Sequence, residues 1–179
     1  MILRIALLFV AIGSVVILAS CKQTPPPAAN NSPAATPATT NTPGPLPDTG
    51  FKAEVTLADQ APKLRAGQKE TVAIRVKNTS DVTWWQRGGE INTRSDNQFY
   101  IAAGSRWRDK DGKPTDEPEG HNGIPKDLKP GETTDMTLEI TAPKTPGEWT
   151  LELDMVQEGV AWFSDKGSPT TKVKVTVVK

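Results

Sequence analysis

Hydrophobic and polar residues alternate along the chain from about residue 50 onward. The clearest case is Thr71–Lys77, where Val72, Ile74 and Val76 share one parity and polar residues stand between them. A period of two places successive side chains on opposite faces of a strand, so this segment is predicted to be a half-buried β-strand. The same pattern predicts further strands, whose inward rows are Val55 and Leu57; Phe99, Ile101, Ala103 and Trp107; Thr134, Met136, Leu138 and Ile140; Trp149, Leu151, Leu153 and Met155; and Val173, Val175 and Val177.

Turn residues separate the predicted strands. Asn78–Asp81, Lys110–Gly112 and Pro146–Gly147 combine the Asn, Asp, Gly and Pro residues that are typical of turns. Residues 111–131, which hold several Pro, Gly and acidic residues, are expected to form a long loop. Gly and Pro interrupt every long window, which argues against helices. Residues 50–179 are therefore predicted to be an all-β domain, a sandwich of two antiparallel sheets with about seven to nine strands.

The first 21 residues follow a different pattern. After Arg4, an apolar run from Ile5 to Ala19 has a length that suits the hydrophobic region of a signal peptide better than a membrane span. It ends in Leu18-Ala19-Ser20-Cys21, which resembles the lipobox of bacterial lipoproteins. That resemblance implies a signal peptide over residues 1–20, cleavage before Cys21 and attachment of a diacylglyceryl group to its thiol. An uncleaved signal anchor with a chance cysteine is the alternative.

Proline dominates the segment that follows the cysteine. Half of the chain's 16 prolines lie in residues 22–49, aromatics are absent and Leu46 is the only large aliphatic residue. Such a segment cannot bury enough apolar surface to offset its ordering entropy, so residues 21–49 are predicted to be a lipidated, disordered tether. A recognition segment for a proline-binding partner is the alternative. The anchor is expected in the cell membrane or the outer membrane, and Lys22 after the cysteine favours the outer membrane if the organism has one. The domain is expected to face the periplasm or the exterior.

The charge balance and the low numbers of Cys and His exclude several classes of function. The 21 basic and 21 acidic side chains balance without a block of like charge, so no nucleic-acid partner is expected. One Cys and one His are too few for a zinc site of Cys and His ligands, and no metal or cofactor is predicted. No Gly-x-Ser-x-Gly motif occurs either. The sequence favours a non-catalytic module over an enzyme.

Two segments contain residues that could support other chemistry. Asp109-x-Asp111-Gly112 resembles the start of a calcium loop, but Lys113 and Gly120 stand where that loop needs oxygen ligands. A plain hairpin turn is therefore expected, although the acidic residues up to position 119 could gather an ion loosely.

The other segment contains His121 and two carboxylates. His121 is expected to be a solvated loop residue. Glu158 and Asp165 flank Trp162-Phe163, and a pair of carboxylates beside an aromatic residue could serve glycoside hydrolysis. The turn at Glu158 is instead expected to aim Trp162 into the sandwich.

The aromatic residues divide into two groups. A structural role in packing is predicted for Trp84, Trp107, Trp149, Trp162 and Phe163. Trp85 neighbours Trp84 and should face the other way in extended chain, while Tyr100 and Arg106 fall on the outward parity of a strand. Exposed aromatics beside Arg are common at interfaces, so Trp85, Tyr100 and Arg106 are the candidate binding face.

Several segments resemble one family in their order and spacing. They are Val76–Trp84, Arg106–Gly112, Leu128–Glu132, Ala142–Gly147, Leu151–Gly159 and Trp162-Phe163. Together they resemble the immunoglobulin-like "four-tryptophan" (FW) domains and related domains appended to bacterial glycosyltransferases. Ser80, Trp149 and Trp85 depart from that pattern. The resemblance implies an immunoglobulin-like fold and non-catalytic binding.

These observations lead to a functional hypothesis. We expect a membrane-anchored lipoprotein that presents an immunoglobulin-like module to an unidentified protein or glycan of the cell envelope. The alternatives are a structural accessory subunit of an envelope complex without its own ligand, and a polysaccharide-active enzyme.

Overall fold

The computed structural model describes residues 43–89 and 96–179. The predicted signal peptide, Cys21 and the tether up to residue 42 lie outside this part of the chain, so the lipobox and the anchor remain predictions. Among the described residues, no helix has the length and apolar character needed to cross a membrane.

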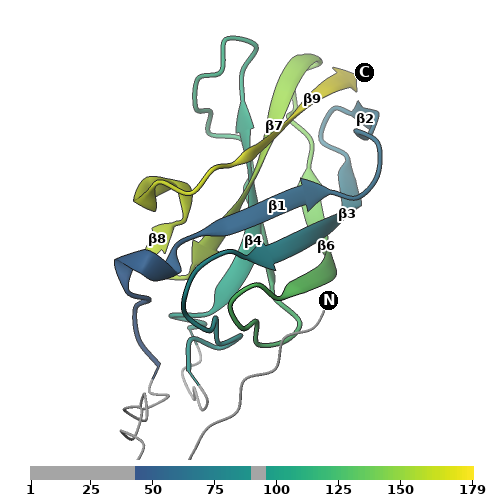
Figure 1. Ribbon diagram of the computed structural model, residues 1–179. Coiled ribbons are helices and arrows are strands. Elements are labelled where there is room, and N and C mark those ends of the chain that lie inside the picture. The colour runs from purple at the N-terminus through teal and green to yellow at the C-terminus, as the bar shows by residue number, and fades with distance from the viewer. Residues whose placement is uncertain (1–42, 90–95) are drawn as a thin grey trace, which may run out of the picture. The chain divides into compact units, whose positions relative to one another are not determined.

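The domain consists of two β-sheets packed face to face (Figure 1). The small sheet has the order β1-β3-β6, and the large sheet has the order β2-β9-β7-β4-β5, with β8 also paired to β7. The strands are β1 (Ala53–Leu57), β2 (Leu64–Arg65), β3 (Lys69–Asn78), β4 (Ile101–Arg108), β5 (Gly120–Gly123), β6 (Thr133–Thr141), β7 (Gly147–Gln157), β8 (Ala161–Trp162) and β9 (Thr171–Val178). Two short 3₁₀ helices, η1 (Asp48–Gly50) and η2 (Ser164–Lys166), complete the described elements.

The strand order is that of an immunoglobulin domain. β1, β3 and β6 take the places of strands A, B and E, while β9, β7 and β4 take those of G, F and C. Every pairing is antiparallel except the short parallel one between β2 and β9. The predicted fold class, an all-β immunoglobulin-like sandwich, is confirmed.

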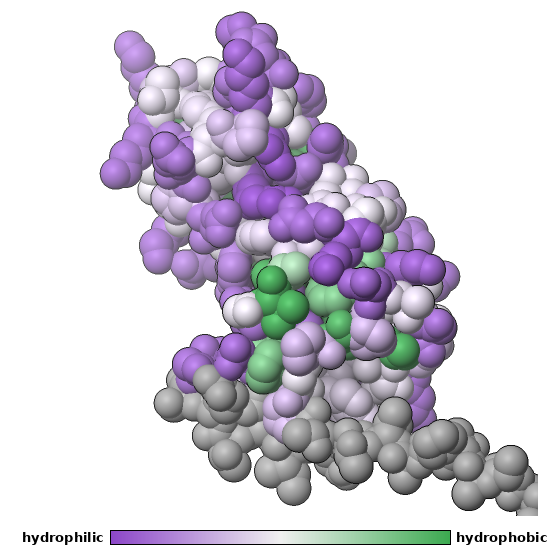
Figure 2. All heavy atoms as spheres, turned by 90° about the vertical axis from the view of Figure 1, so that its left-hand side faces the viewer, coloured by the Kyte–Doolittle hydropathy of each residue, from purple (hydrophilic) through white to green (hydrophobic). Residues whose placement is uncertain are grey.

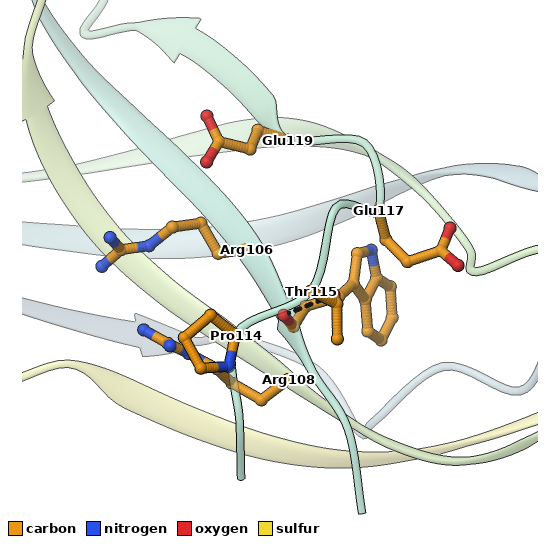
Figure 3. A pocket seen from close by; sticks show the side chains of 7 residues that line it. Arg106, Arg108, Pro114, Thr115, Glu117 and Glu119 are labelled. Carbon is orange, nitrogen blue, oxygen red and sulfur yellow. Dashed lines mark hydrogen bonds between the residues drawn. The ribbon is translucent and has the colours of Figure 1, made fainter.

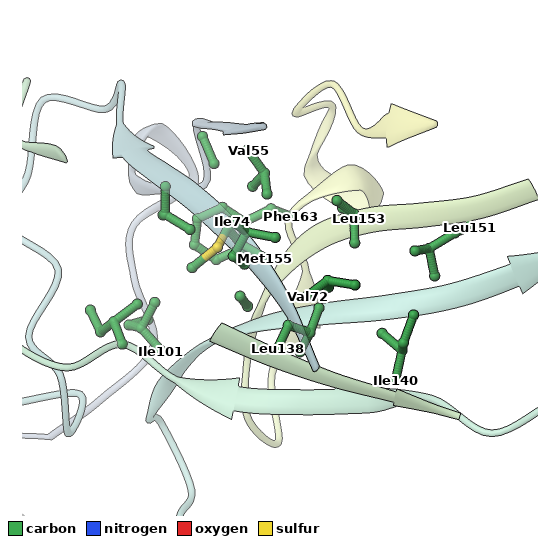
Figure 4. Close-up of a cluster of buried hydrophobic side chains, with 14 of the residues drawn as sticks. Val55, Val72, Ile74, Ile101, Leu138, Ile140, Leu151, Leu153, Met155 and Phe163 are labelled. Carbon is green, nitrogen blue, oxygen red and sulfur yellow. The ribbon is translucent and has the colours of Figure 1, made fainter. Parts of the chain in front are cut away.

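The core lies between the sheets and is built by the alternating rows (Figure 4). On β3 the side chains of Val72, Ile74 and Val76 are buried while their neighbours face outward. Val72 lies opposite Leu138 of β6 in the ladder. The inward side chains of β7, which come from the other sheet, complete the layer; they are Leu151, Leu153 and Met155.

Buried aromatic rings close one end of this core. Trp84 and Phe51 both pack edge-on against Phe163, with ring centroids 5.2 and 5.1 Å away. The indole N–H of Trp84 donates to the carbonyl of Gly50, and that of Trp107 donates to the carbonyl of Thr141. Their polar atoms are therefore satisfied inside the core.

The last residues of the predicted tether are docked on the domain. The backbone N–H of Leu46 donates to Oε1 of Gln157 at 2.8 Å, and Nε2 of Gln157 donates to the carbonyl of Gly44 at 3.0 Å. Leu46 also packs against the core. Gly44 and Leu46, which fall within the predicted tether, are thus held by a buried glutamine and by the packing of the one large aliphatic side chain of the segment.

The outer surface is mostly polar. Figure 2 views the side of the molecule on which β8 lies, where hydrophilic side chains cover most of the face and hydrophobic ones gather in a small lower area. Among the described residues, the large hydrophobic side chains that are exposed are Val160 and Val178.

Candidate functional site

The outer face of the large sheet carries acidic residues that are buried although they point away from the core. On β7, Glu152 and Asp154 alternate with the core residues and are only 4% and 2% exposed. A carboxylate removed from water in this way needs charged or hydrogen-bonding partners.

Arginines of the neighbouring strand β4 supply these partners. The strand register places Arg106 directly opposite Glu152. Arg108 donates from Nε to Oε2 of Glu152 at 2.7 Å, and its Nη2 lies 2.6 Å from the same oxygen. Arg106 donates from Nη2 to Oδ2 of Asp154 at 3.0 Å and to the hydroxyl of Ser164 at 2.8 Å. The two guanidinium groups are therefore held in place by buried carboxylates.

The pKa values of the two acids are shifted in opposite directions. Burial raises the pKa of Glu152, but hydrogen bonds from Arg108 and Thr170 and the charges of Arg108 and Arg106 outweigh it, so that its pKa lies below the ordinary value. The more enclosed Asp154 has a raised pKa, because the hydrogen bonds from Ser164 and Met155 and the charge of Arg106 offset only part of its desolvation.

Trp162 covers part of this polar network from outside the sandwich. The guanidinium carbon of Arg106 lies 4.2 Å from the centroid of the indole, a cation–π arrangement. Beneath the ring is Gly104 of β4, where an added Cβ would come within 2.5 Å of the indole. The expectation that Trp162 points into the sandwich is therefore wrong; a glycine on the outer face of β4 makes room for it there.

His121 lies beside Trp162 rather than in an isolated loop. It belongs to β5, and its ring meets the indole edge-on with centroids 5.0 Å apart. Its Nδ1 is 2.9 Å from Oε1 of Glu158, and its Nε2 is 3.5 Å from Oε2 of Glu119. Glu158, one of the two carboxylates considered for glycoside hydrolysis, is thus engaged with His121, while Asp165 is exposed on η2.

A cleft opens next to the two arginines. Its volume is about 310 Å³, and it lies between β4 and the arm that leads to β5 (Figure 3). The lining residues are Arg106, Trp107, Arg108, Pro114, Thr115, Glu117 and Glu119. Figure 3 shows both guanidinium groups pointing the same way, with the carboxylate of Glu119 on the side of Arg106. The cleft therefore offers hydrogen-bond donors and acceptors together.

The acidic segment before the cleft forms a hairpin turn. Oδ1 of Asp109 accepts the backbone N–H groups of Asp111 and Lys113, and these bonds lower the pKa of Asp109. Gly112 adopts a positive φ of 81° at the tip of the turn. Within residues 43–89 and 96–179, no group of three His, Cys, Asp or Glu side chains is arranged to hold a metal ion.

The three residues of the predicted binding face lie in different surroundings. Trp85 and Tyr100 are both half-buried in the segments before β4. Arg106 is joined to Asp154, Ser164 and Trp162 instead, and no hydrogen bond or ring contact among the described residues links it to Trp85 or Tyr100. The proposal of this face remains a prediction.

Sequence reasoning missed Arg108, Glu152 and Asp154. A signal for them was present, because the outward positions of one predicted strand are basic while those of another are acidic. Opposite charges on facing positions of neighbouring strands form cross-strand pairs.

Comparisons with solved structures find distant likenesses in fold. No protein-family model matches the chain, and no curated protein matches its sequence. The CARDB domain of PF1109 from Pyrococcus furiosus is 13% identical with a TM-score of 0.36, over 71% of this chain and 93% of that domain. A β-glucosidase from Listeria innocua is 15% identical with a TM-score of 0.42, over 72% of this chain and 16% of the enzyme. The C-terminal domain of wzt is 11% identical with a TM-score of 0.39, over 71% of each chain. The resemblance to FW domains remains a prediction.

Proposed function

We propose that this chain is a lipid-anchored lipoprotein whose immunoglobulin-like domain is a non-catalytic module that binds a protein or glycan of the cell envelope. The lipobox-like Leu18–Cys21 segment and the proline-rich residues after it support the anchor. A tether of this composition would hold the domain near a membrane and let it search the surrounding space. Tethering raises the effective concentration of a binding site, so a small interface suffices.

The observation that carries the binding role is the polar cleft beside Arg106 and Arg108. Buried carboxylates fix both guanidinium groups, so a ligand would meet donors that are already oriented. Glu117 and Glu119 line the same cleft and provide acceptors. A volume of about 310 Å³ is at the lower end of the range for ligand sites, which suits one sugar unit or one projecting side chain.

A capture experiment tests the cleft. The purified protein is applied to a glycan array and used in pull-downs from envelope extracts. The double variant Glu117→Ala/Glu119→Ala should lose about tenfold in affinity for the captured ligand, which corresponds to roughly 1.4 kcal/mol. The matched control is Glu54→Ala/Glu139→Ala, which removes two exposed carboxylates from the small sheet. Equal binding by both double variants would rule out the cleft.

A second experiment tests the anchor. Mass spectrometry of the native product should find a chain that begins at Cys21 and carries a diacylglyceryl group. The Cys21→Ala variant should leave the membrane fraction. A native product that still carries residues 1–20 and a free thiol would contradict the proposal.

A further inference from the structure

A second depression lies beside residues 109–110 of the hairpin and the turn that leads into β7. Its volume is about 310 Å³, and its lining residues are Asp109, Lys110, Pro146, Gly147, Glu148 and Trp149. We call it the Trp149 groove. Trp149 differs from Trp84 and Trp107, which are fully buried, because its indole is half-buried and lines this depression.

The indole of Trp149 is fixed in one orientation. Its N–H donates to the carbonyl of Thr145 at 3.0 Å. Gly147 is its close neighbour: a Cβ there would lie 3.9 Å from Nε1 of Trp149. Glycine has no side chain that could cover this edge of the indole, and the half-buried ring lines the groove. An aromatic ring that is held by the protein and partly exposed loses little entropy when it stacks on a ligand.

The polar groups of the groove are also held in place. Asp109 accepts two backbone hydrogen bonds through Oδ1, which leaves its other oxygen for a ligand. Glu148 accepts a hydrogen bond from the hydroxyl of Thr176 at 2.7 Å. Asp109 and Glu148 line the same groove as the indole, and hydrogen bonds to ionised acceptors are stronger than those between neutral groups.

We propose that the Trp149 groove binds a single pyranose ring of a glycan, with the C–H face of the sugar on the indole of Trp149 and its hydroxyl groups donating to Asp109 and Glu148. The negative face of an indole attracts polarised C–H groups, and carboxylates accept hydrogen bonds from adjacent hydroxyls. This inference rests on the proposed binding function and narrows its ligand to a glycan.

The groove adjoins the cleft along the chain. Arg108, which lines the cleft, lies opposite Thr150 in the ladder, and Thr150 directly follows Trp149. Asp109, which lines the groove, directly follows Arg108. Residues that line the cleft and the groove are therefore neighbours along the chain and on adjoining strands.

Nuclear magnetic resonance of the indole N–H groups tests this site directly. The full chain is labelled with ¹⁵N-tryptophan in a sugar-free detergent and titrated with cellohexaose, chitohexaose and xylohexaose. The chain has five tryptophans, and the signal that is lost in Trp149→Phe is assigned to Trp149. Saturable binding of at least one oligosaccharide should shift the Trp149 signal. If none of the three shifts it at millimolar concentrations, the proposal is overturned.

Variants separate stacking from a role in folding. Trp149→Ala should weaken oligosaccharide binding about tenfold. Because Trp149 also packs against the core, Glu148→Gln is the second variant: it keeps the bond to Thr176 and should weaken binding about threefold without a shift in melting temperature. Glu54→Gln, which changes an exposed carboxylate on β1 of the small sheet, is the matched control and should bind as the wild type does. Unchanged affinity in both Trp149→Ala and Glu148→Gln would refute the proposal.

The outcome also distinguishes this inference from the proposed function. If an oligosaccharide or an envelope protein is bound with loss in Glu117→Ala/Glu119→Ala but without a shift at Trp149, the binding function stands and the groove does not take part. If no ligand is captured in any format, the binding function itself fails.

Discussion

Glu152 and Asp154 are two residues apart on the same face of β7, yet their charges affect stability in opposite directions. Glu152 has a lowered pKa in the fold, so its ionised form stabilises the domain above its unfolded pKa, and that contribution is lost as the pH falls through its folded pKa. Asp154 has a raised pKa, so its ionisation opposes folding as the pH rises above the unfolded value. The outer face of the large sheet therefore combines a stabilising and a costly charge.

The Glu152→Gln variant tests the stabilising charge. At pH 7 it leaves Arg108 without its main partner and should lower the free energy of unfolding by about 2 kcal/mol, which is less than for a fully enclosed pair because Arg108 is 21% exposed. Below the folded pKa of Glu152 the wild type is protonated too, so the difference should shrink toward zero. Urea unfolding at a series of pH values from 7 downward follows the difference between the two proteins, and a difference that stays constant over the whole series would contradict this.

Gly104 is a second residue whose role follows from a single contact. The Gly104→Ala variant should push the indole of Trp162 off β4 and lower the free energy of unfolding by about 1–2 kcal/mol. Gly123 on the neighbouring strand is the matched control, because the nearest atom to an added Cβ there is 4.0 Å away. Thermal melting compares the two, and a similar shift in both variants would argue against the packing of Trp162 on Gly104.

Among the secondary-structure elements, the strands whose alternation was visible in the sequence are those with one solvent-exposed face. β3, β6 and β9 each bury one parity and expose the other, which is why their alternation was visible. β5 was missed inside a predicted loop because its sequence, Gly-His-Asn-Gly, has no hydrophobic row, and its place is set by pairing with β4. β2 and β8 have two residues each, too few to form any pattern.

The candidate site was predicted less completely than the strands, for a reason that β7 illustrates. From Thr150 onward its outward residues are as buried as its inward ones, and Arg106 and Arg108 cover the acidic ones. A period-two pattern identifies which side chains point away from the core. It does not tell which of those side chains are buried by side chains of a neighbouring strand. Arg106 was therefore proposed as a site residue, while its acidic partners were not.

The docked segment before β1 provides a prediction for truncation. A chain that begins at residue 50 loses the bonds of Gly44 and Leu46 to Gln157, whose side chain is buried. It also loses the packing of Leu46 on the core. Its free energy of unfolding should be about 2 kcal/mol lower than that of a chain beginning at residue 43. Denaturation in urea compares the two fragments, and identical midpoints would mean that the segment does not stabilise the fold.

At the scale of the whole domain, both sheets share one core. Trp84 packs on Phe163, and Trp107 of the large sheet bonds to Thr141 of the small sheet. A domain with a single core of this size should unfold in one cooperative step. Tryptophan fluorescence and far-ultraviolet circular dichroism should report the same midpoint in urea. Separate midpoints would mean that the two sheets unfold independently.

The hydrogen bonds of Gln157 determine where a pulling force would enter the domain. A force transmitted through the chain before residue 43 acts first on Gly44 and Leu46, whose backbone groups are hydrogen-bonded to the side-chain amide of Gln157. Gln157 ends β7, which has neighbours on both sides in the large sheet, whereas β1 is an edge strand of the small one. A force applied through the preceding chain would therefore act on β7, which is paired on both sides, before it could separate β1 from the small sheet.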